Sequence, residues 1–358
     1  MKIIDRYIIR KFLGTFFLAI TLIMMIVVVF DLSEKMGDFI EKSPPLEAIL
    51  FDYYKNFIPY FANLFSPLFC FIAVIYFTSR MASRTEIVAI LSSGVSFYRL
   101  LFPFLLSAFF LSLLSLYLSN FVIPHANLHR IAFEDAYINN PYYNSEINIH
   151  RQVSPGTFIY FNSYNTTEDK GYQFSMEKIS NGNRYWYLRS DDVRWDSVKN
   201  KWTIRNYFIR EISGTAEKVR KGETLDTILP FSASDFGERP RSIETMDWKE
   251  AQNFIEKEKL RGSQDLEKYR VKVQERFAYP FATIILTIIA VALASRKVRG
   301  GIGLHLGLGF GIAFSYILFM QIAINFSIKA GVPALISVWI PNLLYLVLAI
   351  YLLRRAPK

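Results

Sequence analysis

The chain consists of long uncharged apolar stretches interrupted once by a long polar segment. Six stretches lack Asp, Glu, Lys and Arg and reach the length of about 20 residues that a helix needs to cross a membrane. They are residues 12–30, 57–79, 100–123, 277–295, 300–328 and 330–353. A short turn around Lys329, Gly331 and Pro333 separates the last two. The pattern predicts six transmembrane helices, three before and three after the polar segment.

The polar segment follows a different pattern. Aromatic and aliphatic side chains come in short runs near residues 158–161 and 185–188, as is typical of half-buried strands. Trp195 and Trp202 flank a polar hexapeptide that suits a hairpin connection. We therefore expect an antiparallel sandwich or an open barrel here.

The periodicity becomes helical after Pro240. Asp247 and Glu250 have the spacing of a capping box, and Gly262 is a helix stop signal. The expected parts are residues 1–123 with three membrane helices and a cytoplasmic connection near 80–94, residues 124–242 with the strands, residues 243–276 as a helical return, and residues 277–358 with three more membrane helices.

Composition and charge narrow the class of protein. With 52% hydrophobic and 16% aromatic residues the chain cannot be disordered, and its single cysteine, Cys70, excludes an internal disulfide. The net charge of +10 raises the question of nucleic-acid binding. The basic excess, however, is concentrated in short loops and termini on one membrane face, where it sets topology. These residues are Lys2, Arg6, Arg10, Lys11, Arg80, Arg84, Arg99, Arg296, Lys297, Arg299, Arg354, Arg355 and Lys358. We expect both termini in the cytoplasm, the polar segment outside, and no nucleic-acid partner.

Catalytic motifs are missing from the sequence. It contains no phosphate-binding loop, no H-E-x-x-H and no G-x-S-x-G, so we do not expect an enzyme that hydrolyses nucleotide unaided. His125 and His129 have the i, i+4 spacing of metal ligands, but no third ligand is evident nearby, which favours ordinary interfacial histidines. Gly303, Gly307 and Gly311 form a smooth helix face for packing within this chain, or against a second subunit or a lipid-lining wall.

The connection between the second and third spans has helical periodicity. Ile87, Ile90 and Leu91 recur at helical spacing, and Glu86 is the only acid in any inter-span loop of the basic face. This pattern fits a surface amphipathic helix. A docking helix that offers Glu86 to a positive groove on a cytosolic partner is the alternative, although composition alone favours the surface helix.

Four stretches make the sequence resemble a known family. They are Asp5-Arg6-Tyr7-Ile8, Arg84-Thr85-Glu86 followed by Ser93-Gly94, Phe121-Val122-Ile123-Pro124, and the segment from Met246-Asp247-Trp248 through Tyr269-Arg270 to Pro280. In order and spacing they are similar to the lipopolysaccharide-export permeases of the LptF/LptG (YjgP/YjgQ) type, over essentially the whole chain. Residues 331–333 and the glycine-rich fifth span look closer to the LptG type.

The resemblance implies a permease subunit of an ATP-driven transporter in the bacterial inner membrane. In this family two sister permeases pair, and two copies of a cytosolic ATPase dock beneath their coupling helices. Lipopolysaccharide leaves the outer leaflet of the inner membrane and passes to periplasmic bridge proteins with jellyroll domains. The resemblance thus implies a periplasmic β-jellyroll-like domain here. It also implies that this chain binds no cofactor, since ATP and Mg are used by the partner ATPase.

The resemblance also suggests individual site residues. The family's coupling-helix glutamate falls on Glu86, with Arg84, Ile87 and Ile90 as further ATPase-docking residues. Arg130 lies where similar members carry arginine, and Arg130 with Lys35 would meet lipid phosphates. An apolar surface for acyl chains would include Phe158, Tyr160 and Trp186. Some members carry a basic residue near the outer end of the first span, whereas residues 12–30 contain none here.

Two other functions remain open from the sequence. A mechanotransmission or scaffold protein would move its outer domain with ATP hydrolysis without carrying lipid. A membrane-bound enzyme acting on lipid-linked sugars would need paired carboxylates, for which Asp191 and Asp192 are candidates in an expected turn between strands.

Overall fold

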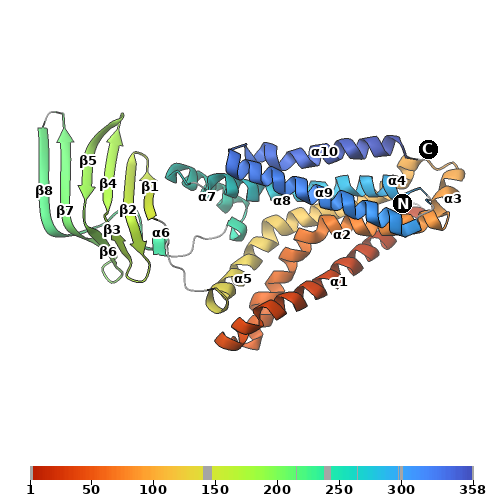
Figure 1. The fold of residues 1–358 in the computed structure, drawn as a ribbon, viewed down its shortest axis with the longest axis horizontal. Coiled ribbons are helices and arrows are strands. Elements are labelled where there is room, and N and C mark those ends of the chain that lie inside the picture. Colours follow the sequence, from red (N-terminus) through yellow and green to blue (C-terminus); the bar gives the residue numbers. More distant parts are fainter. Residues whose placement is uncertain are drawn as a thin grey trace. The chain divides into compact units, whose positions relative to one another are not determined.

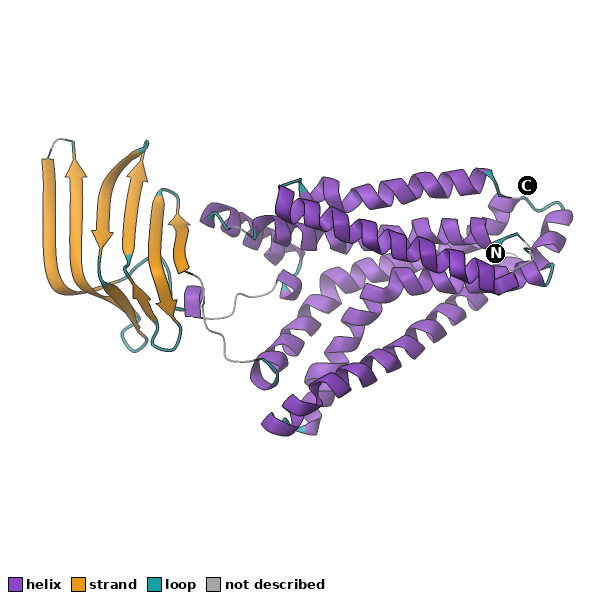
Figure 2. Ribbon diagram, viewed as in Figure 1, coloured by secondary structure: helices purple, strands orange, loops and turns teal. Residues whose placement is uncertain are grey.

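The computed structural model describes residues 3–139, 147–214, 216–237, 243–263, 265–296, 298 and 301–356. Contacts divide the chain into two compact units. The helical unit comprises Met1–Asn139, Ile243–Ala251 and Glu267–Lys358, and the β unit comprises Asn140–Ser242 and Gln252–Leu266. Figure 1 labels the elements and Figure 2 separates helices from strands by colour. Several residues used in the sequence analysis lie outside the described residues, namely Lys2, Pro240, Lys297, Arg299, Gly300 and Lys358.

Helices account for the first unit. Before the insertion they are α1 (Ile3–Lys42), η1 (Ala48–Tyr54), α2 (Lys55–Ser83), α3 (Glu86–Ser92), α4 (Phe97–Tyr117), η2 (Leu118–Val122) and α5 (Ile123–Tyr137). After it come η3 (Ile243–Thr245), α7 (Trp248–Arg261), α8 (Leu266–Ala294), α9 (Gly301–Ala330) and α10 (Ala334–Arg354). Only the first residues of α7 belong to this unit, because Gln252–Leu266 belongs to the β unit. Within the described residues, six helical segments are long and apolar enough to cross a membrane, which confirms the three-plus-three prediction.

The boundary expected at residue 124 falls inside a continuous helical run. α4 passes through the π-helical turn η2 into α5, and the first described strand begins at Ile147. Pro124 does not end the helix because it occupies the first turn of α5, where a backbone N–H has no obligatory partner. The third membrane helix therefore extends beyond the apolar run that predicted it.

The structure confirms three local features predicted from the sequence: a turn, a helix capping box and a helix stop. α9 and α10 form a hairpin through Gly331, whose φ is +68°. The capping box of α7 is reciprocal, because the Glu250 backbone N–H donates to Asp247 at 2.8 Å and the Asp247 N–H donates to Glu250 at 3.2 Å. Gly262 follows α7 with a φ of +70°, which glycine adopts without steric cost.

The glycine face of α9 is open within this chain. A Cβ atom at Gly303, Gly307 or Gly311 would meet nothing within 4 Å. Gly309, on another side of the helix, packs so closely on the buried Ile75 of α2 that a Cβ there would overlap the Ile75 side chain. The prediction that the three-glycine face packs within this chain is therefore wrong. The close approach of α9 to α2 is at Gly309 instead.

Two long strands of the β unit each pair with three other strands. Its strands are β1 (Ile147–Ser154), β2 (Thr157–Asn165), β3 (Lys170–Tyr172), β4 (Ser175–Ser180), β5 (Asn183–Arg189), β6 (Asp192–Asp196), β7 (Lys201–Ser213) and β8 (Ala216–Thr227). β2 pairs with β1 on one edge and with β3 and β4 on the other. β7 likewise pairs with β8 on one edge and with β5 and β6 on the other. All pairs are antiparallel, which confirms the inserted jellyroll-like domain.

Aromatic rings fill the core of the β unit. Trp202 is fully buried, stacks near Phe231, and donates from Nε1 to the Phe231 carbonyl at 2.9 Å. The predicted hairpin is confirmed, since Trp195 and Trp202 are cross-strand partners. Gly171 is required beside this core because a Cβ there would overlap the buried Phe161 ring.

Candidate functional site

The short helix α3 holds Glu86 in its first turn. Thr85 adopts a left-handed backbone with a φ of +60°, and this sharp turn ends the run of α2 and starts α3. The partly exposed Glu86 carboxylate accepts a hydrogen bond from the Tyr7 hydroxyl of α1 at 3.1 Å. Arg84 is exposed next to it. Arg84 and Glu86 can therefore both be reached from outside the chain.

The apolar residues of α3 divide between the core and the surface. Ile87 is 1% exposed and belongs to the core of the helical unit, and Ile90 packs against that core. They hold α3 in place in this structure and do not form its free surface. The exposed apolar side chain is Val88, at 54%. The sequence pattern missed it because the periodic positions are those that face inward.

A second polar contact holds the same end of α1. Arg99 of α4 donates to the Asp5 carboxylate at 2.7 Å, and the Asp5 side chain is 5% exposed. Asp5 was named only as part of a stretch that resembles the family, and its pairing with a residue 94 positions away could not be predicted from local spacing. The first turns of α1 are thus tied to α3 through Tyr7 and to α4 through Asp5.

At the other end of α1 the structure brings the two predicted cations together. Arg130 of α5 is paired with Glu134 at 3.1 Å, and Lys35 of α1 lies 4.0 Å from the same Glu134 oxygen. Lys35 also pairs with Asp31 at 3.0 Å and donates to the Tyr53 hydroxyl. We call Asp31, Lys35, Arg130 and Glu134 the ion cluster.

The ion cluster is mostly shielded from solvent. The side chains of Arg130 and Lys35 are 11% and 18% exposed. The Arg130 guanidinium lies 4.9 Å from the centre of the Tyr60 ring and donates to the Asn127 side chain at 3.2 Å. Two acids and two bases give the cluster no net charge, so it is a paired network and not an open basic patch.

A cavity of about 310 Å³ lies in the same helical unit, lined by residues of α2, η2, α5, η3, α8 and α9. Lys272 of α8 contacts Glu244 of η3 at 3.2 Å and Glu275 of its own helix at 3.5 Å. Arg276 donates to the Ile243 and Met246 carbonyls at 2.7 and 2.9 Å, which anchors the chain where it returns from the β unit. The sequence analysis predicted only a helical return over residues 243–276 and missed this cavity, although the charges preceding an apolar span were its signal.

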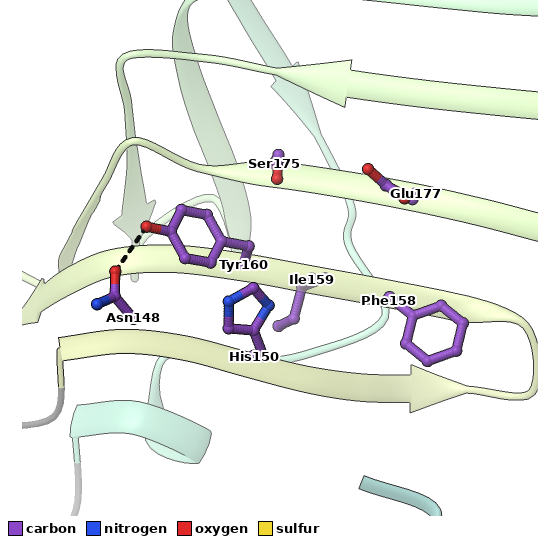
Figure 3. A pocket seen from close by; sticks show the side chains of 7 residues that line it. All are labelled: Asn148, His150, Phe158, Ile159, Tyr160, Ser175 and Glu177. Carbon is purple, nitrogen blue, oxygen red and sulfur yellow. Dashed lines mark hydrogen bonds between the residues drawn. The ribbon is translucent and has the colours of Figure 1, made fainter. Parts of the chain in front are cut away.

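In the β unit, two of the three predicted acyl-contact residues share a pocket. Phe158 and Tyr160 of β2 line a hollow of about 560 Å³ together with His150, Ser175 and Glu177 (Figure 3). The Tyr160 hydroxyl donates to Asn148 at 2.9 Å, and its ring lies 4.6 Å from that of His150. Phe158 and Ile159 give the lining an apolar part, and most of the other lining residues are polar.

Trp186 lies on the opposite face of the sheet. It pairs with Lys178, whereas Phe158 pairs with the neighbouring Glu177, so the alternation of strand side chains turns Trp186 inward. Its ring packs against the core and carries the Lys178 ammonium 5.0 Å above it. The structure therefore does not bring the three residues into one surface.

Three of the remaining candidates for chemistry, Asp191, Asp192 and His125, have polar partners. Asp191 accepts from Asn206 at 2.8 Å, and Asp192 faces Lys170 at 3.5 Å and Arg205 at 4.0 Å. His125 contacts the Phe121 carbonyl within its own helical run. Across the part of the chain that the structure describes, no three His, Cys, Asp or Glu side chains are grouped to hold a metal ion.

Comparison with known proteins gives one family. Residues 6–355 match the family model described as lipopolysaccharide export system permease LptF/LptG. The match covers both units and all six apolar helical segments within the described residues. No curated protein matches the chain significantly.

Proposed function

The chain belongs to the LptF/LptG family of lipopolysaccharide export permeases, and on this premise we propose that it extracts lipopolysaccharide from the inner membrane and passes it to a periplasmic bridge. The observation that carries the proposal is the match over nearly the whole chain, from the start of α1 to the end of α10. A transport permease is not itself an enzyme.

The energy for extraction comes, in this proposal, from a separate ATPase dimer. Withdrawing acyl chains from a bilayer costs about 0.8 kcal/mol per CH₂, which is far too much for spontaneous release of a lipid with several chains. The sequence has no phosphate-binding loop with which to supply that energy. Arg84 and Glu86, exposed or partly exposed at the start of α3, are the proposed docking residues, and ATP with Mg acts in the partner.

The proposed assembly has the α3 end of the helical unit in the cytoplasm, with both termini, and the β unit in the periplasm. A sister permease completes the pair. The face formed by Gly303, Gly307 and Gly311 supports this pairing because it is smooth and uncovered within the chain. The glycine-rich α9 and the Gly331 turn favour the LptG type.

The substrate path in this proposal begins at the ion cluster and continues to the β unit. Lys35 and Arg130 supply the cations for lipid phosphates, and Phe158 with Tyr160 offers an outward surface to acyl chains. Trp186 would meet lipid only if the interior of the β unit admits it, because its ring packs on the core.

Photo-crosslinking tests the proposal directly. A photo-crosslinking residue replaces Phe158 in the chain reconstituted in vesicles with its sister permease, the ATPase and lipopolysaccharide. We expect capture of lipopolysaccharide that requires ATP. Val198 is the matched control, since it is 91% exposed in the β6–β7 turn of the same unit and does not line the pocket.

Two results would contradict the proposal. Capture that is equal at both positions, or independent of ATP, would remove the lipid path. If ATP hydrolysis responds to the permease while neither position captures lipid, the mechanotransmission or scaffold function is favoured instead.

A further inference from the structure

The ion cluster contains one carboxylate shared by the two cations proposed to bind phosphate. Glu134 Oε1 lies 3.1 Å from Arg130 Nη1 and 4.0 Å from Lys35 Nζ. Arg130 and Glu134 are one turn apart on α5, so the helix itself holds this pair together. Lys35 reaches the same oxygen from α1.

This arrangement leaves neither cation free for a phosphate group. With side chains 11 to 20% exposed, Arg130, Lys35 and Glu134 interact with less solvent screening than surface ion pairs do. A phosphate that binds here must therefore take the place of the Glu134 carboxylate, which has the same charge sign and the same hydrogen-bonding chemistry.

The arginine is held in place by contacts that do not involve Glu134. Its Nε donates to Asn127 at 3.2 Å, and its guanidinium lies over the Tyr60 ring. Lys35 is likewise held by Asp31 at 3.0 Å. If Glu134 turned away, both cations would remain where they are, ready for another anion.

We propose that Glu134 is a displaceable internal counter-ion, which occupies the phosphate position of the ion cluster until a lipid phosphate replaces it. The inference rests on the proposed function, because its ligand is a phosphate-bearing lipid. Its consequence is reversible binding: the returning carboxylate competes with the phosphate and promotes release, which a transporter needs and a storage site does not.

The test is an equilibrium binding measurement on the full chain in nanodiscs. The probes are lipid A carrying its phosphates and the same lipid dephosphorylated. Glu134→Gln keeps the shape and the acceptor oxygen but removes the charge, so we expect about tenfold tighter binding of phosphorylated lipid A, equivalent to about 1.4 kcal/mol. Binding of the dephosphorylated lipid should not change.

Asp135→Asn is the matched control. Asp135 is the next residue on α5, is exposed, and accepts a hydrogen bond from the Asn139 side chain just after the helix. This variant removes the same charge without touching either cation, and we expect binding within about twofold of the parent chain. If Glu134→Gln fails to elute as a folded chain, Glu134→Asp replaces it, since the shorter side chain keeps the charge but draws the carboxylate away from both cations.

The outcomes separate the two hypotheses. If Arg130→Gln loses phosphorylated lipid A while Glu134→Gln binds it no more tightly than the parent, the counter-ion role is overturned and the proposed function stands. An equal gain in Asp135→Asn would also overturn it, because the effect would then be one of general charge. If the parent chain shows no preference for phosphorylated lipid A and Arg130→Gln changes nothing, the phosphate site fails and the inference fails with it.

Discussion

At the scale of single residues, Glu86 shows how one side chain can serve two contacts. Its carboxylate accepts from Tyr7 inside the chain, yet it remains partly exposed at the first turn of α3. A carboxylate has acceptor sites for about four hydrogen bonds, so the Tyr7 contact leaves room for a cationic group of a partner.

We predict that Glu86→Gln weakens ATPase docking on the order of tenfold, as expected for the loss of a hydrogen bond to a charged group. Co-purification of the ATPase with the permease pair measures this, alongside lipopolysaccharide export. Tyr7→Phe is the control, because it removes the internal bond and keeps the carboxylate. If Glu86→Gln retains the ATPase as well as Tyr7→Phe does, Glu86 is not a docking residue.

Tyr164 makes the stability of the β unit sensitive to alkaline pH. Burial and the neighbouring Asp169 carboxylate, to which its hydroxyl donates at 3.3 Å, raise the pKa of Tyr164 well above its usual range. A raised folded-state pKa means that the neutral phenol stabilises the fold. This contribution is complete below a pH of about 10, the unfolded value, and is lost as the pH rises further.

We therefore expect the free energy of unfolding to fall above that pH by up to about 1.4 kcal/mol per pH unit through this group. Tyr164→Phe should reduce this dependence and cost about 1 kcal/mol near neutral pH through the lost hydrogen bond. Tryptophan fluorescence during denaturant unfolding follows the core of the unit. Tyr185→Phe, at an exposed tyrosine of β5, should keep the alkaline loss; identical pH profiles for the two variants would contradict this explanation.

At the scale of elements, α1 joins two groups of polar contacts in the helical unit. It is one uninterrupted helix of 40 residues, from Ile3 to Lys42. Its first turns carry the contacts of Asp5 and Tyr7, and its last third carries Lys35 of the ion cluster. The single helix α1 therefore contributes residues both to the contacts with α3 and α4 and to the ion cluster.

Gly309 allows a close approach between α9 and α2. We predict that Gly309→Ala destabilises the chain by about 1–3 kcal/mol, because the added methyl overlaps the buried Ile75 side chain. Adding Ile75→Val removes the overlapping Cδ1 atom and should restore part of the loss. Gly307→Ala meets nothing within 4 Å and should leave thermal stability in detergent unchanged. Equal losses for the two glycine variants would exclude this packing argument.

At the scale of the whole molecule, the structural features that depend on residues close together in the sequence could be predicted. Apolar length predicted six membrane helices, and the Trp195–Trp202 hairpin and the Asp247–Glu250 capping box followed from local spacing. The contacts of the ion cluster join residues of α1 and α5 that are far apart in the chain. Glu86 stood out in the sequence as the only acid in the inter-span loops of the basic face, but no local pattern could indicate Glu134, because the sequence does not record which acid faces which base.

Membrane orientation is a property of the whole molecule, and labelling of single cysteines can test it. Cys70 is fully buried in the helical core, so the parent chain should give little background with a membrane-impermeant maleimide. Val198→Cys, in a turn of the β unit, should react in intact spheroplasts, whereas Arg84→Cys, beside α3, should react only after the membrane is opened. The concentration of basic residues near α3 requires this order by the positive-inside rule. Labelling of Arg84→Cys from outside would place the docking helix on the wrong side for a cytosolic ATPase.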